Sequence, residues 1–141
     1  MLGLFKILLI TSLLMQLLAI CYSDILHRTV SNRFIITITL NTIALGLTIH
    51  NTVNITIPLC SLLVGYIIFH FNLIGGGDVK LITALLFSLN LQESLDFIIY
   101  TAIMGGVVMT IGMLINKVDI KKRGVPYAVA ISGGFLLSLF S

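Results

Sequence analysis

Charged residues are scarce in this 141-residue chain, which contains only eight basic and five acidic residues. They make up 9% of the sequence, against roughly a quarter in soluble globular domains. Hydrophobic residues make up 58%, and the mean hydropathy is +1.16. These values exclude a soluble globular domain and leave almost no residues for an extramembrane domain. The chain is therefore predicted to be an integral membrane protein.

The sequence also lacks the patterns of disulfide, metal and nucleic-acid sites. Its two cysteines, Cys21 and Cys60, lie in separate apolar segments and form no CxxC pair, so we expect both to be packing residues. His27, His50 and His70 are scattered, and no His or Cys cluster has the spacing of metal ligands. No stretch rich in basic and aromatic residues indicates nucleic-acid binding. We expect no metal, no cofactor and no nucleic-acid partner.

The first apolar segment could be a signal peptide, because Lys6 precedes it. However, Ile20 stands where a lipoprotein signal needs a small residue before the cysteine. The rest of the chain is equally apolar, so no soluble domain waits to be exported. We expect this segment to be retained as a transmembrane helix.

Long apolar segments divide the chain into six expected helices. About 20 residues cross a hydrocarbon core of about 30 Å, and open strands cannot satisfy their backbone there. Residues 34–77 contain no Lys, Arg, Asp or Glu over 44 residues, enough for two spans joined by the polar turn 50–54. The expected spans are 7–23, two within 34–77, 79–91, 97–116 and 125–140. The predicted fold class is all-α, a polytopic membrane protein with about six transmembrane helices.

Two of the five acidic residues stand at the edges of these spans. Asp24 closes the first span, and Asp78 comes directly before the fourth. Because the second and third spans cross the membrane and return, both aspartates are predicted to lie on the same side. A carboxylate near a bilayer is costly, which points to a function. Two carboxylates that share a proton can hydrolyse a peptide bond.

Basic residues predict which side of the membrane this is. Only Lys6 falls on the side opposite the aspartates. The basic residues on the aspartate side are Arg28, Arg33, Lys80, Lys117, Lys121, Lys122 and Arg123. The positive-inside rule therefore places Asp24 and Asp78 at the cytoplasmic face, with both chain termini outside.

Three glycines precede the second aspartate. We expect Gly75, Gly76 and Gly77 to keep the backbone irregular and to let a substrate strand approach closely. The fourth span is short, since 13 residues at 1.5 Å each cover roughly 20 Å. Asp78 is therefore expected below the membrane surface, where irregular backbone is tolerated beside protein or a water-filled cavity.

Three segments of the chain resemble motifs of one family. Residues 24–32 (DILHRTVSN) and 75–81 (GGGDVKL) resemble the two motifs of the type IV prepilin leader peptidases, which are GxGD intramembrane aspartyl proteases. Residues 125–130 (VPYAVA) are similar to a segment of the small members that serve tight-adherence (Flp-type) pili. The resemblance implies one transmembrane peptidase domain over residues 1–141, without an N-methyltransferase domain. Ser31 stands where the family usually has proline, so we expect a less rigid turn after Asp24.

The resemblance also implies a site and a substrate. It makes Asp24 and Asp78 the catalytic pair. The residues expected to support the site or bind substrate are Gly75, Gly76, Gly77, Lys80, Asn32 and Tyr127. Lys80 and Tyr127 could instead be residues of the membrane interface. The expected partners are membrane lipids and prepilins or pseudopilins, whose basic leader ends in glycine before an apolar helix. Cleavage would occur at the cytoplasmic face of the bacterial inner membrane, during type IV pilus biogenesis and protein secretion.

Other interpretations fit part of this pattern. Intramembrane carboxylates and broken helices also mark the ion pathways of transporters and channels. However, the two halves of the chain contain no internal repeat, and both aspartates lie toward one face of the membrane. A non-catalytic pilus assembly factor would tolerate Asp→Asn changes, whereas a protease would not. Asp24 could also pair with Arg28 at the interface, and Asp78 could be a helix N-cap.

Overall fold

The computed structural model describes residues 2–27, 31–53, 55–72, 74–123 and 127–140. Within these ranges the regular secondary structure is entirely helical, as the sequence predicts. The six helices are α1 (Leu2–His27), α2 (Asn32–His50), α3 (Thr56–His70), α4 (Gly76–Leu86), α5 (Leu91–Arg123) and α6 (Tyr127–Phe140). The expected all-α fold is confirmed.

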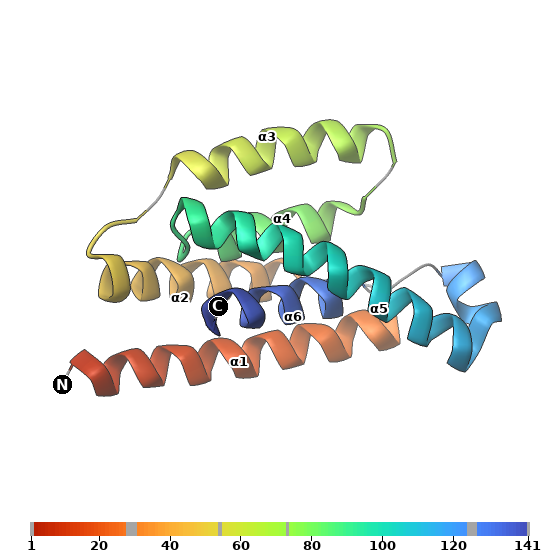
Figure 1. The fold of residues 1–141 in the computed structure, drawn as a ribbon, viewed down its shortest axis with the longest axis horizontal. Coiled ribbons are helices and arrows are strands. Elements are labelled where there is room, and N and C mark those ends of the chain that lie inside the picture. Colours follow the sequence, from red (N-terminus) through yellow and green to blue (C-terminus); the bar gives the residue numbers. More distant parts are fainter. Residues whose placement is uncertain (1, 28–30, 54, 73, 124–126, 141) are drawn as a thin grey trace.

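Successive helices run in opposite directions along the bundle (Figure 1). The end of α1 and the start of α4 therefore lie at the same end of the molecule. Asp24 is in the last turn of α1, and Asp78 is in the first turn of α4. The two aspartates share one end of the bundle, as the count of spans predicts.

The helices differ in how far they could reach through a bilayer. Three apolar segments are long enough to cross a membrane by length and composition: Gly3–His27, Asn32–His50 and Leu91–Val118. Helices α3 and α6 are shorter but also apolar. Helix α4 has 11 residues, which cover roughly 17 Å. This all-helical, strongly apolar architecture is that of a polytopic membrane protein.

The fourth helix does not have the bounds that the sequence predicts. It begins at Gly76 instead of Val79 and ends at Leu86 instead of Leu91. Its end is fixed by the start of α5, where Asn90 and Glu93 form a reciprocal cap. The Glu93 N–H donates to Asn90 Oδ1 at 2.8 Å, and the Asn90 N–H donates to Glu93 Oε2 at 3.2 Å. This capping box begins a new helix within an apolar run that hydropathy alone assigns to one span.

Helix α4 lies in the middle of the bundle although it is the shortest helix (Figure 1). Leu81 and Leu85 on α4 are completely buried. They belong to a core that also includes Leu17 of α1 and Phe135 of α6. The buried Thr42 Oγ1 of α2 donates a hydrogen bond of 2.7 Å to the carbonyl oxygen of Ala84. Packing and this interhelical hydrogen bond fix the helix that carries Asp78.

Helix α5 contains a break at Asn116, whose φ of −150° and ψ of 80° are not helical. Beyond it the chain turns away from the line of the helix (Figure 1). The basic residues Lys117 and 121–123 follow this break. The sequence predicts the end of the fifth span at Asn116, and the break confirms that boundary.

Candidate active site

Asp24 is held at the end of α1 by the start of α6. Only 7% of its surface is exposed, and its Oδ2 accepts a hydrogen bond of 3.2 Å from the backbone N–H of Ala128. Ala128 lies in the first turn of α6, where free N–H groups give the helix end a partial positive charge. The dipole of α1 itself disfavours a negative charge in its last turn. The amino end of α6 offsets this, so α6 makes a carboxylate tolerable at this position.

Asp78 is positioned by the start of α4. Gly75 is the N-cap of this helix, with an extended backbone at φ −75° and ψ 149°. A Cβ at Gly75 would lie only 3.3 Å from Asp78 Oδ2. The missing side chain at Gly75 therefore leaves the room that the Asp78 carboxylate occupies.

The structure brings the two carboxylates into one electrostatic environment. Asp24 lies near enough to Asp78 for its charge to act on the Asp78 carboxylate. Helix α6 packs against both α1 and α4, the helices that carry the two aspartates. A pair of carboxylates that shares one proton can activate water with one member and a carbonyl with the other. The catalytic role of the pair stays a prediction.

Two of the expected support residues contact each other. Lys80 Nζ donates to Asn32 Oδ1 at 3.1 Å and so joins the start of α4 to the start of α2. Both side chains are exposed at the aspartate end of the bundle. Tyr127 begins α6 at the same end, is 43% exposed and stands next to Ala128. Lys80, Asn32 and Tyr127 thus lie at the aspartate end of the bundle, and their roles in the site stay predictions.

The less rigid turn expected after Asp24 stays a prediction, because most of that turn lies outside the described residues. Ser31 is the N-cap of α2, and its Oγ accepts a hydrogen bond of 3.3 Å from the N–H of Arg33. Serine is a favoured N-cap residue, so a hydrogen bond supplies order where the family usually has proline. The rest of this turn, residues 28–30 with Arg28, lies outside the described residues. So do Val125 and Pro126 of the third motif.

The prediction of irregular backbone at the three glycines is wrong. Gly76 and Gly77 are the first residues of α4, and Gly75 has an ordinary negative φ. The glycines instead let neighbouring side chains come close to the backbone. Gly75 does this for Asp78, and a Cβ at Gly76 would lie 3.6 Å from the ring of Phe69. The glycines therefore leave space around the helix start without needing a left-handed backbone.

The contacts of Cys21 were missed by sequence reasoning. Its Sγ lies 3.4 Å from Ser132 Oγ and 3.8 Å from the carbonyl oxygen of Ala128. Cys21 is three residues before Asp24 and thus shares its face of α1. It packs α1 against α6 beside the Asp24 contact, as expected of a packing residue. Cys60 is different, because it lies exposed on α3.

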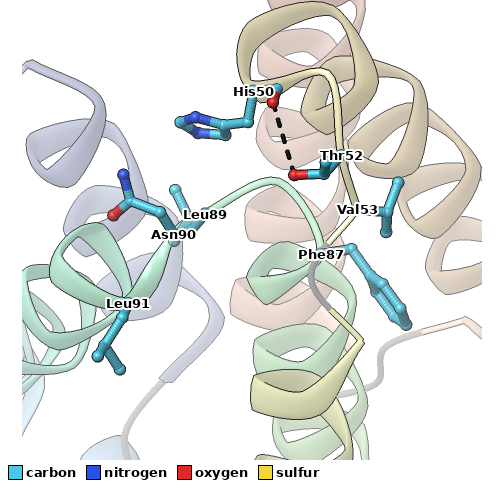
Figure 2. Close-up of a pocket in the computed structure, with 7 residues that line it drawn as sticks. All are labelled: His50, Thr52, Val53, Phe87, Leu89, Asn90 and Leu91. Carbon is cyan, nitrogen blue, oxygen red and sulfur yellow. Dashed lines mark hydrogen bonds between the residues drawn. The ribbon is translucent and has the colours of Figure 1, made fainter.

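The opposite end of the bundle contains a separate cavity of about 310 Å³. Figure 2 shows its lining, formed by His50, Thr52, Val53, Phe87, Leu89, Asn90 and Leu91. His50 Nε2 lies 3.2 Å from Glu93 Oε2 and joins α2 to α5 here. Neither candidate catalytic aspartate lines this cavity. Within the described part of the chain, no three His, Cys, Asp or Glu side chains gather into a possible metal site.

A comparison with known families adds an independent observation. The model of the type IV leader peptidase family matches residues 9–110, which include both Asp24 and Asp78. The match ends before Tyr127 and Ala128 of α6. No curated protein and no solved structure matches the chain significantly.

Proposed function

Because the chain belongs to the type IV leader peptidase family, we propose that it is an aspartyl endopeptidase that removes the leader peptide from type IV (Flp-like) prepilins. The observation that carries this proposal is the pair of Asp24 and Asp78 at one end of the bundle. They come from different helices, 54 positions apart, yet their charges interact. The family match covers both residues.

The proposed reaction uses the two carboxylates and one water. The ionised carboxylate accepts a proton from the water, whose oxygen attacks the carbon of the scissile carbonyl. The protonated carboxyl donates a hydrogen bond to the carbonyl oxygen. The C–N bond then breaks as its nitrogen takes a proton, which leaves a carboxyl end on the leader and a free amine on the mature pilin. Either aspartate can be the ionised member, because the two carboxylates titrate as a coupled pair.

Coexpression with a prepilin tests the activity itself. The protein should shorten a prepilin by the length of its leader, which a mobility shift on a gel detects. Unchanged prepilins in every tested pairing, with the protein present in the membrane, would contradict the proposed function.

We further propose that the protein crosses the bacterial inner membrane several times, with the aspartate end at the cytoplasmic face. Arg33, Lys80 and Lys117 lie at that end, whereas Glu93 and Asp96 lie at the other. This asymmetry supports the orientation through the positive-inside rule. The proposed cleavage site is then reachable by a prepilin that has just been synthesised.

Thiol labelling should report this orientation. His27 and Gln92 are exposed at opposite ends of the bundle, so each can be replaced by cysteine in a chain with Cys21→Ser and Cys60→Ser. An impermeant thiol reagent should label His27→Cys in inverted membrane vesicles and Gln92→Cys in intact spheroplasts. The reverse pattern would overturn the orientation.

The space beside Asp78 should matter for the rate of cleavage. Gly75→Ala is expected to slow leader removal about tenfold, about 1.4 kcal/mol of barrier, because the new Cβ would crowd Asp78 Oδ2 at 3.3 Å. Gly76→Ala is the matched control. Its Cβ meets the Phe69 ring at an ordinary 3.6 Å, and alanine favours a helix. Gly76→Ala should stay within about twofold of wild type. Equal cleavage rates for the two variants, at equal membrane levels, would contradict this role of Gly75.

A further inference from the structure

An apolar groove of about 400 Å³ lies between α3 and α4. One wall is a face of α3, the other is a face of α4, and Ile98 of α5 contributes at the side. The lining residues used below are Cys60, Val64 and Gly65 of α3 with Val79, Ile82 and Leu86 of α4. No charged side chain lines the groove among the described residues. Its chemistry therefore suits an apolar occupant.

One end of the groove lies next to the candidate catalytic Asp78. Val79 is the residue directly after Asp78, and Ile82 and Leu86 follow it along the same face of α4. From Val79 to Leu86 the groove extends by roughly 10 Å along the helix axis. A chain whose scissile bond lies at Asp78 would meet the groove with the residues immediately beyond that bond.

The two walls are set at a fixed spacing by a glycine. A Cβ at Gly65 would lie 2.5 Å from Val79 Cγ1, so α3 and α4 touch at this point only because residue 65 has no side chain. Farther along α3, Cys60 and Val64 stay exposed along the groove. The groove is therefore open on the side of these two exposed residues.

The volume of the groove indicates how an occupant would lie in it. A helix is about 10 to 12 Å across, so a length of about 10 Å fills roughly 800 to 1,100 Å³. The groove of about 400 Å³ holds at most about half of that volume. It can take one face of an apolar helix and leave the other face to lipid.

We propose that this groove binds the apolar helix that follows the scissile bond of the substrate. The inference rests on the proposed function, because it concerns the substrate of the same site. The groove begins at Val79, the residue after Asp78, has an apolar lining and has room for one helix face. A polar, basic leader finds no partner there, so the leader lies on the cytoplasmic side of Asp78 and the apolar helix on the membrane side. A lipid chain or a second copy of this protein are the other possible occupants.

Native Cys60 provides a direct test by disulfide cross-linking. Gly76 of α4 packs against Phe69, so the start of α4 lies level with Phe69 on α3. Cys60 is nine residues from Phe69, roughly 14 Å deeper in the membrane. Asp78 is two residues beyond Gly76, roughly 3 Å deeper, so Cys60 lies roughly 11 Å beyond the level of Asp78. In a Cys21→Ser chain, Cys60 should therefore form a disulfide with single cysteines placed about seven residues after the scissile bond. Cross-linking should recur every three or four substrate positions, as one helix face requires.

The matched control moves the thiol to the lipid side of α3. Leu63 is 67% exposed and does not line the groove. A chain with Cys21→Ser, Cys60→Ser and Leu63→Cys should give no periodic cross-linking. Equal cross-linking from Leu63→Cys would overturn the inference, and so would disulfides only between two copies of Cys60. Absence of substrate cross-links at Cys60, in a protein that still cleaves the prepilin, would also overturn it.

Filling the groove gives a second readout. Val64→Trp should raise the KM for a full-length prepilin about tenfold and change kcat by less than about twofold, because it blocks binding of the apolar helix and leaves the aspartates unchanged. Leu63→Trp, on the lipid side, should leave both constants within about twofold of wild type. An unchanged KM in Val64→Trp would overturn the proposed binding of the apolar helix in the groove, while leaving the proposed peptidase function intact. Failure of the wild-type protein to cleave any prepilin would instead overturn the proposed function.

Discussion

Asp78→Asn is expected to abolish leader cleavage, with a loss of at least about a thousandfold, or about 4 kcal/mol of transition-state stabilisation. Asparagine has nearly the same shape as aspartate, but it can neither take a proton from water nor share one with Asp24. Helix α4 packs into the core through buried apolar residues such as Leu81 and Leu85, and the substitution leaves these residues unchanged. Expression and membrane insertion should therefore be normal, and a coexpressed prepilin should keep its leader on a gel.

Asp96→Asn is the matched control for this experiment. Asp96 lies on α5 at the far end of the bundle, where its Oδ1 accepts a hydrogen bond from Gln92 that an asparagine oxygen can also accept. The variant should cleave at the wild-type rate. Substantial processing by Asp78→Asn would contradict the aspartate pair and would favour a non-catalytic assembly factor.

Asp24 should show two separable effects, one on catalysis and one on stability. Asp24→Asn should lose cleavage to the same extent as Asp78→Asn, because the pair again lacks one titrating group. Its side-chain oxygen can still accept the N–H of Ala128, so the contact between α1 and α6 should persist. Asp24→Leu removes that acceptor and leaves a buried N–H unsatisfied, which costs about 1–3 kcal/mol.

Cleavage assays and thermal unfolding in detergent, performed on both variants, measure the two effects separately. We expect no cleavage by either variant, and a lower unfolding temperature for Asp24→Leu alone. If Asp24→Asn unfolds as early as Asp24→Leu, the acceptor role of Asp24 is wrong. If Asp24→Asn still cleaves, the residue is structural.

Much of the fold follows from the sequence because a bilayer imposes simple rules. The polar turn after α2 is real, and Asn51 ends that helix with a left-handed φ of 58°. The break of α5 at Asn116 also lies where the apolar run ends. The bounds of α4 could not be obtained in the same way. Hydropathy carries the apolar run past Leu86 to Leu91, whereas the cap formed by Asn90 and Glu93 divides it.

The candidate site was predictable only in part. Counting spans is enough to predict that Asp24 and Asp78 lie at the same end of the bundle, because the count does not depend on which helices are in contact. The Asp24–Ala128 and Lys80–Asn32 contacts join residues 104 and 48 positions apart. Such pairs depend on the packing order of the helices, for which one sequence contains no local signal. The irregular backbone expected at the glycines is wrong, because a helix begins at Gly76 and the glycine next to Asp78 supplies space.

The most direct test of the account is cleavage of a purified prepilin by the purified protein in detergent, in the presence of a chelator, with product masses determined by mass spectrometry. The wild-type protein should cut once, between the basic leader and the apolar helix, and Asp24→Asn and Asp78→Asn should leave the prepilin intact. Cleavage by either aspartate variant, or activity that the chelator removes and zinc restores, would contradict the account.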